Sequence, residues 1–180
     1  LSFKPATMRR LLEIKHKISG KVCEYSLELF KSSPEFCVGR WIAPKGNPYA
    51  IPAGAVSWGV WPIQTGGCWG AYRLHRPDGT ISSYRFDAVE RISFTNLHHL
   101  SMIEYHDLVV DAIVVPSPDG DLRVTIEDRD ELNDYVDQNA VSAEQLKIIA
   151  EFETLATLGM KDLIKIVDTE IDGIDSKCLS

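Results

Sequence analysis

Residues 107–131 read DLVVDAIVVPSPDGDLRVTIEDRDE, and this segment carries the strongest structural signals in the chain. Two runs rich in β-branched residues, 107–115 and 122–126, flank the turn-forming residues 116–120, a pattern typical of a β-hairpin. The D-x-x-E pattern formed by Asp128 and Glu131 follows at once and predicts the start of a helix. The segment therefore indicates a chain that changes here from strands to helices.

Upstream of this segment, turn signals such as Ser19-Gly20 and Pro77-Asp78-Gly79 separate short alternating or aromatic-rich runs. These runs predict six further strands, at 11–18, 22–29, 36–43, 55–61, 68–75 and 81–92. Eight short strands in succession favour a mainly β fold of the α+β kind, with an antiparallel barrel or sandwich.

Downstream, the predicted first helix ends near Asn139, and the S-x-x-Q pattern of Ser142 and Gln145 opens a second helix that Gly159 interrupts. We expect a single domain over residues 1–180, with a β-barrel at 8–127 and C-terminal helices at 128–167. The polar, acidic residues 168–180 are expected to fray.

Bulk composition excludes several classes of protein. Of 180 residues, 44% are apolar, but no apolar run approaches the roughly 20 residues that span a bilayer, so no membrane partner is expected. The net charge of −7 and the lack of a basic stripe disfavour nucleic-acid binding. The four cysteines show no CxxC spacing, and the first ten residues contain no hydrophobic stretch of the secretory kind. Both observations predict a cytoplasmic protein. Since residue 1 is Leu, the natural N-terminus is expected upstream. The sequence does not predict the oligomeric state.

Acidic residues are concentrated between residues 104 and 138, where only Arg123 and Arg129 oppose them. Such a concentration is either a solvated face or a cation site. Asp107 and Asp111 share a face if the segment is a strand, but four extended residues span about 13 Å. Both could serve one site only if the strand bulges, if Asp107 lies in a preceding loop, or if two metal ions are bound.

Asp111 is the most informative of these residues, because it interrupts an otherwise apolar run. A buried charge without a partner costs several kcal/mol. Three explanations are open: a surface-facing position, an arginine partner such as Arg85 or Arg123, or a metal ion.

The other acidic candidates have structural explanations of comparable weight. Asp128 and Glu131 would satisfy free N–H groups at the start of a helix, although a carboxylate that caps a helix can also bind a metal. Asp87 is either an aspartate at a strand edge or a further metal ligand on the barrel wall.

The order of these motifs resembles the FomD-like barrel hydrolases, which include nucleoside tri- and diphosphate phosphatases and a cytidylyl-phosphonate hydrolase. The resemblance extends over about residues 68–167. It implies an antiparallel β-barrel closed by C-terminal helices, with two divalent ions, Mg²⁺ or Mn²⁺, bridged by acidic side chains. The residues that match the ligand positions of the family are Asp87, Asp107, Asp111, Asp128 and Glu131.

Two departures from the family pattern concern catalysis. Phosphatases of the family carry a further aspartate where this chain has Val109, and an arginine-tryptophan motif whose arginine is the proposed proton donor. The comparable residues 21–26 contain no arginine. Lys21, His16 and Arg40 are therefore the candidate proton donors.

We take Trp61 and Tyr84 as candidate substrate contacts, because an aromatic face accepts any base; packing in the core is the alternative. The leading hypothesis is a divalent-metal-dependent hydrolase of a phosphoanhydride or phosphodiester bond in a nucleotide-like small molecule. The alternatives are a non-catalytic nucleotide- or protein-binding member of the same barrel family and an RNA-processing accessory protein.

Overall fold

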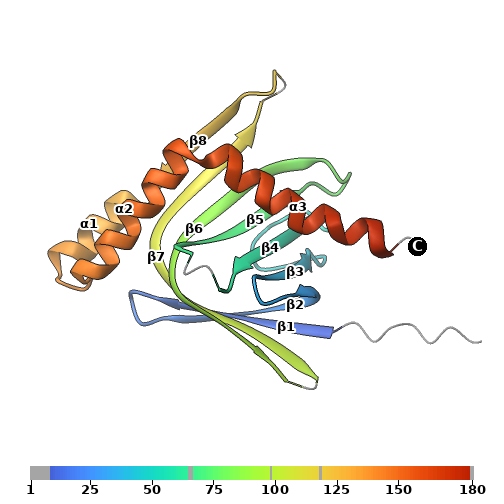
Figure 1. The fold of residues 1–180 in the computed structure, drawn as a ribbon, viewed down its shortest axis with the longest axis horizontal. Helices are drawn as coiled ribbons and strands as arrows, with labels where there is room; N and C mark the ends of the chain where they lie inside the picture. The colour runs from blue at the N-terminus through green and yellow to red at the C-terminus, as the bar shows by residue number, and fades with distance from the viewer. Residues whose placement is uncertain (1–8, 65–66, 98, 118, 179–180) are drawn as a thin grey trace, which may run out of the picture.

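A computed structural model of the chain describes residues 9–64, 67–97, 99–117 and 119–178, and its ribbon is drawn in Figure 1. Pro118, which belongs to the hairpin turn quoted above, lies outside these residues. Within the described part of the chain, no helix combines the length and the apolar character that crossing a membrane requires.

The strands follow the predicted alternation closely. Most differ from the predicted ranges by a few residues at the ends, and the largest difference is a strand that begins at Leu100 rather than at Asp107. Their bounds are β1 Arg9–Lys17, β2 Val22–Ser32, β3 Phe36–Ile42, β4 Val56–Pro62, β5 Trp69–His75, β6 Ile81–Asn96, β7 Leu100–Pro116 and β8 Leu122–Glu127.

The sheet closes on itself into a barrel, but the prediction of a purely antiparallel barrel is wrong at one seam. Each strand from β1 to β7 pairs antiparallel with the next, and β1 also pairs with β7 in parallel. In an up-and-down order of seven strands, the first and the seventh run in the same direction. A ring of seven described strands therefore contains one parallel pair, and β8 adds to the outside of this ring through β7.

β7 changes neighbours halfway along its length. Its first half, Leu100 to Asp107, pairs with β1, whereas Asp111 to Pro116 pairs with β8. Between these halves the ladder to β6 shifts: β6 advances two residues from Asp87 to Val89 while β7 covers four, from Asp111 to Asp107. This bulge bends β7 at the point where β1 and β8 diverge, as the long curved strand in Figure 1 shows.

Three helices follow β8: α1 Arg129–Asp137, α2 Ala143–Leu158 and α3 Met160–Cys178. The predicted capping box is confirmed, because Ser142 and Gln145 bond reciprocally to each other's backbone N–H groups. Gly159 separates α2 from α3 as predicted. The expectation that the chain frays from residue 168 is wrong: α3 continues to Cys178, because Ile171 and Ile174 are buried against the barrel.

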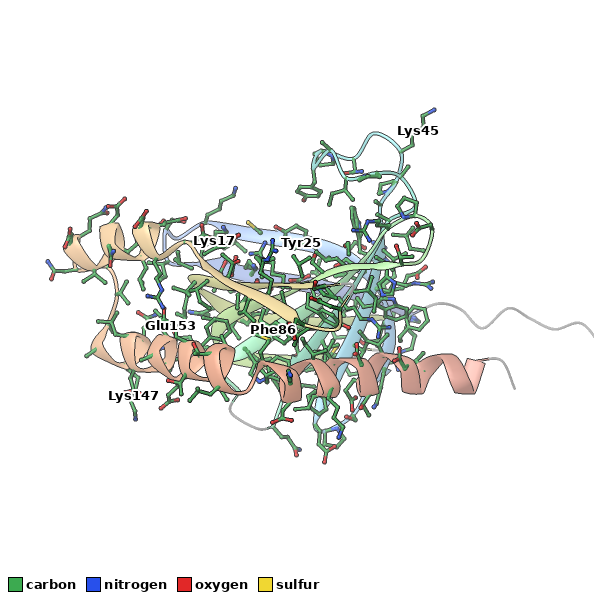
Figure 2. The ribbon with its side chains drawn as sticks, turned by 90° about the horizontal axis from the view of Figure 1, so that it is seen from above. Lys17, Tyr25, Lys45, Phe86, Lys147 and Glu153 are labelled. Atoms are coloured by element: carbon green, nitrogen blue, oxygen red, sulfur yellow. The ribbon has the colours of Figure 1, made fainter. Side chains whose placement is uncertain are left out.

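The barrel has two distinct apolar regions. Helices α2 and α3 run along one side of the barrel, where Phe86 lies between them and the strands (Figure 2). A smaller cluster draws on strands all around the ring and therefore fills the interior; it consists of Leu11, Leu27, Cys37, Trp61, Val89, Ile103 and Tyr105.

Trp61 is the largest side chain in this interior cluster, and it fits only because glycines surround it. A methyl group added at Gly59 would lie 2.2 Å from the Trp61 ring, and one at Gly70 would lie 3.1 Å from it. The indole also meets the ring of Tyr72 edge to face, with 5.9 Å between centroids. Trp61 thus supports Tyr72, which lines a cavity described below.

Gly59→Ala is expected to lower the free energy of unfolding by about 1–3 kcal/mol, because overpacking forces Trp61 out of its position. Urea denaturation followed by circular dichroism measures this change. The control is Gly173→Ala in α3, where an added methyl group meets no atom within 4 Å and the helix gains up to about 1 kcal/mol. Equal denaturation midpoints for Gly59→Ala and the unmodified chain would contradict the packing described here.

Candidate functional site

The bulge in β7 brings the two aspartates of the D-x-x-x-D pair to one cavity. Val109, at the centre of the bulge, has φ 77°, a conformation that costs a β-branched residue about 1–3 kcal/mol. Its N–H donates to Asp107 Oδ1 at 2.9 Å. The bulge is thus the first of the three arrangements that the spacing of Asp107 and Asp111 left open.

This carboxylate cavity has a volume of about 50 Å³, which is room for a water molecule or a small ion. Four of the five predicted metal ligands lie in its wall, and Asp87 is not among the lining residues. The residues that line it are Lys17, Ile18, Arg85, Asp107, Val109, Asp111, Asp128, Glu131 and Tyr135.

Asp128 and Glu131 reach the carboxylate cavity because helix α1 starts directly behind β8. Glu127, the last residue of β8, pairs with Asp111, so that Asp128 follows beside the bulge. The interpretation of Asp128 as a capping side chain is wrong. Its backbone is left-handed, with φ 63°, and its side chain makes no capping hydrogen bond.

Two cations, Lys15 and Arg85, lie among the aspartates. Lys15 Nζ is 2.6 Å from Asp87 Oδ2 and 3.4 Å from Asp107 Oδ2. Arg85 Nε is 2.7 Å from Asp87 Oδ1, and its Nη2 is 2.5 Å from Asp111 Oδ2. An arginine partner for Asp111, one of the three explanations considered from the sequence, is therefore present.

The surroundings shift the pKa values of the two central carboxylates in opposite directions. Burial alone would raise the pKa of Asp87, but Lys15 and Arg85 outweigh burial and lower this pKa to about 2. Burial, followed by the charge of Asp87, raises the pKa of Asp111 although Arg85 is adjacent. Arg85 contacts both acids, whereas Lys15 contacts only Asp87 of the two. We attribute the opposite pKa shifts to this arrangement, because Asp87 has two cationic partners and Asp111 shares one.

The residues of the carboxylate cavity suit a divalent ion in their chemistry, because carboxylate oxygens are the ligands that Mg²⁺ and Mn²⁺ prefer. Asp111 is 4% exposed, and its buried Oδ1 has no hydrogen-bond partner among the described residues. Within the same residues, however, no three acidic, histidine or cysteine side chains stand close enough to hold one ion together. A bound ion would therefore require the carboxylates to shift from their positions beside Lys15 and Arg85.

A second, larger cavity of about 290 Å³ adjoins the first, and we call it the aromatic cavity. Arg85 lines both cavities. Lys17 of the carboxylate cavity and Tyr25 of the aromatic cavity lie on the side of the barrel away from α2 and α3 (Figure 2). The aromatic cavity is lined by Glu13, Lys15, Tyr25, Leu27, Trp41, Tyr49, Ile51, Ser57, Tyr72, Leu74 and Arg85.

Glu13 is a buried acid in the wall of the aromatic cavity, with only 3% of its surface exposed. The hydroxyls of Tyr72 and Tyr105 both donate to its Oε1, the latter at 2.5 Å. The two hydroxyls are 2.7 Å apart. Burial raises the pKa of Glu13 above its usual value, despite these hydrogen bonds and the nearby Lys15.

The remaining candidates from the sequence lie outside the two cavities. Lys21 is exposed beside the β1–β2 turn, and His16 bonds to Glu104. Arg40 pairs with Glu28 and lines a separate open cavity of about 420 Å³ with Arg9 and Arg10.

The two candidate substrate contacts are not among the lining residues of either cavity. The Tyr84 hydroxyl donates to Asp168 of α3 at 2.9 Å, on the face that the helices cover. Trp61 is fully buried in the interior cluster.

Glu13 and Lys15 are the principal site residues that sequence reasoning missed, and Arg85 was considered there only as a possible partner of Asp111. In β1, Glu13 and Lys15 point inward with Leu11, while Leu12 and Ile14 on the opposite face are only partly buried. Hydrophobic alternation does not indicate which face of β1 points inward, because both faces contain apolar residues. For Arg85, its position two residues before Asp87 on the same strand face is the signal that was available.

Neither a comparison with known protein-family models nor one with curated protein sequences gives a match. Two solved structures are similar over most of their length. FomD in complex with CDP has a TM-score of 0.58 and 14% identity, over 87% of this chain and 85% of FomD. The chain has the FomD fold. The phosphatase SC4828 with the non-hydrolysable nucleotide GPCP has a TM-score of 0.56 and 10% identity, over 82% of this chain and 81% of SC4828.

The resemblance drawn from the motif order is thereby confirmed for the fold. The FomD fold here is the seven-stranded ring with one parallel seam and three C-terminal helices. Both solved structures hold nucleotides, CDP in one and GPCP in the other. These ligands belong to those two proteins, and the chemistry of the present chain depends on its own cavities.

Proposed function

We propose that this chain hydrolyses a phosphoanhydride or phosphodiester bond in a nucleotide-like substrate with the help of a divalent metal ion. The observation that carries the proposal is the position of Arg85, which lines both the aromatic cavity and the carboxylate cavity. A ligand with a flat apolar end and an anionic end would then have its phosphates beside Lys15 and Arg85, next to the acidic residues. The similarity to a nucleotide phosphatase structure supports the same proposal.

Each part of the site has a distinct proposed task. Asp107, Asp111, Asp128 and Glu131 would hold the metal, and Asp87 would keep Lys15 and Arg85 in place through its two ion pairs. The metal, Mg²⁺ or Mn²⁺, would supply charge neutralisation at the phosphate and activation of water.

Arg85 would take part in binding the anionic end of the substrate. A guanidinium matches the geometry of phosphate oxygens, and Arg85 is partly exposed where it reaches the aromatic cavity. Lys15 would add a second positive charge within the same cavity. In the aromatic cavity, Tyr25, Trp41 and Tyr49 would cover the face of a base.

Trp41→Ala is expected to raise KM for nucleoside triphosphates about 5- to 150-fold, because stacking on one base contributes about 1–3 kcal/mol. Steady-state kinetics measures this change. Inorganic tripolyphosphate, which has no base, serves as the control substrate, and its KM should not change. An equal loss for both substrates would contradict a base-binding role of the aromatic cavity.

Turnover tests the proposed function as a whole. Nucleoside di- and triphosphates and cytidylyl esters are incubated with the protein and Mn²⁺ or Mg²⁺, and phosphate or nucleotide release is measured, with excess EDTA as the control. We expect metal-dependent release from at least one substrate. Absence of release from all of them at saturating metal would contradict the proposal.

A second candidate, nucleotide binding without hydrolysis, is favoured by one observation. Lys15 and Arg85 already neutralise the aspartates, and among the described residues no trio of ligands surrounds one point. Tight nucleotide binding by calorimetry, without turnover and without dependence on metal, would support this second candidate.

A further inference from the structure

The proposed hydrolysis needs a proton donor for the leaving group, and the departure from the family motif at residues 21–26 leaves this role unassigned. Among the candidates chosen from the sequence, neither Lys21 nor His16 lines a cavity shared with Lys15 and Arg85. Arg40 is engaged by Glu28 through Nε at 2.9 Å and Nη2 at 2.7 Å. A donor must lie within hydrogen-bond reach of the atom that it protonates.

We propose that Glu13 donates the proton that the leaving-group oxygen takes when the phosphate ester is cleaved. Glu13 lines the aromatic cavity together with Lys15 and Arg85, so a substrate that contacts these two cations lies beside the Glu13 carboxyl. This inference rests on the proposed function, and it adds a catalytic residue to it.

The hydrogen bonds around Glu13 orient its carboxyl group for this role. Both tyrosine hydroxyls donate to Oε1, and no hydrogen bond to Oε2 is found within the described residues. Oε2 is therefore the oxygen that can carry a proton and donate it. Since Tyr72 comes from β5 and Tyr105 from β7, two strands of the ring hold the same carboxyl oxygen.

Burial favours the protonated form of Glu13 and raises its pKa, as a general acid at neutral pH requires. An anionic phosphate in the same cavity would raise this pKa further, because like charges disfavour ionisation. The titratable and charged groups around Glu13 come from six strands: Lys15 on β1, Tyr25 on β2, Cys37 on β3, Tyr72 on β5, Arg85 and Asp87 on β6, and Tyr105 on β7.

The atoms balance in the proposed step. The oxygen of a water molecule forms a bond to phosphorus, and the bond between phosphorus and the leaving-group oxygen breaks with its electron pair on that oxygen. The leaving-group oxygen takes the proton from Glu13 Oε2. One proton of the attacking water passes to solvent, and the Glu13 carboxylate regains a proton from solvent.

The test uses the full chain with Mn²⁺ and a series of nucleoside 5′-monophosphate esters whose phenol leaving groups differ in pKa. Glu13→Gln should slow the ester with the poorest leaving group about 100-fold or more. The p-nitrophenyl ester, which needs little protonation, should lose less than about 5-fold. For the unmodified protein, kcat should fall as the pH rises through the pKa of Glu13, because the donor is lost, and Glu13→Gln should abolish this fall.

Glu24→Gln is the matched control, because Glu24 is an exposed acid on the adjacent strand β2. An equal loss for all leaving groups in Glu13→Gln, or an unchanged pH profile, would overturn the proposal while leaving the proposed function intact. If Glu13→Gln does not fold, the leaving-group series on the unmodified protein decides, since a steep dependence on leaving-group pKa would show that no proton is donated. Absence of turnover in the unmodified protein would instead count against the proposed function.

Discussion

Asp111→Asn is expected to remove Mn²⁺ binding and to lower kcat/KM about 100-fold or more, while the protein stays folded. Loss of a metal ligand removes several kcal/mol of stabilisation from the transition state, and each 1.36 kcal/mol is a factor of ten in rate. The fold should tolerate the change because burial raises the pKa of Asp111 and disfavours its charged form, so that a neutral amide of the same shape is an acceptable replacement. Asparagine also retains an oxygen that can accept from Arg85 Nη2.

Isothermal titration with Mn²⁺, steady-state kinetics and thermal denaturation together measure this prediction. Asp130→Asn is the matched control, because Asp130 is an exposed acid in the first turn of α1 that does not line the carboxylate cavity. We expect Asp130→Asn to bind Mn²⁺ as the unmodified protein does. Unchanged Mn²⁺ binding in Asp111→Asn would contradict the metal site.

Lys15→Met is expected to lower the free energy of unfolding at pH 7 by about 3–5 kcal/mol, because it leaves buried carboxylates without their cation. Lys15 is well buried, with a side chain 8% exposed, and it contacts both Asp87 and Asp107. Two acids that it separates would then face each other in a region from which water is largely excluded. Hydrolysis should also fall, since Lys15 lines the aromatic cavity.

The pH dependence of this loss has a definite sign. In the unmodified protein the lowered pKa of Asp87 contributes stability that is complete above about pH 4 and is lost as the pH falls through about 2. Without Lys15, protonation relieves the repulsion between the carboxylates. The difference in stability between Lys15→Met and the unmodified protein should therefore be largest at pH 7 and should shrink towards pH 4.

Urea denaturation at pH 7 and pH 4 measures both parts of this prediction. Lys147→Met on α2 is the control, because Lys147 is exposed and points away from the barrel (Figure 2). Surface substitutions of this kind change stability by less than about 0.5 kcal/mol. A difference for Lys15→Met that is the same at both pH values would mean that charge is not its cause.

Alternation and turn signals predicted most of the fold, because these signals are local. The strands at 22–29, 36–43 and 68–75 differ from the observed β2, β3 and β5 by up to three residues at either end. The first half of β7 was not predicted, because no turn or alternation signal marks its start at Leu100. The parallel seam between β1 and β7 depends on which strands close the ring, and that is a contact between distant parts of the chain.

The acidic part of the site was predictable, whereas of the basic part only Arg85 was foreseen, as a possible partner of Asp111. A charge in an apolar run marked Asp111, and the motif order added its neighbours, so four of the five predicted ligands share one cavity. Lys15 and Glu13 gave no such signal, since β1 places polar residues inside and leaves Leu12 and Ile14 partly exposed. This orientation is stable only because the charges of β1 are paired with groups on β5, β6 and β7.

Anomalous X-ray diffraction from crystals of the protein soaked in MnCl₂ tests the central claim most directly. We expect manganese in the carboxylate cavity, bound by oxygens of Asp107, Asp111, Asp128 and Glu131, with Arg85 Nη2 moved away from Asp111 Oδ2. Manganese found only on exposed acidic side chains, with the ion pairs of Lys15 and Arg85 intact, would contradict the proposed metal site.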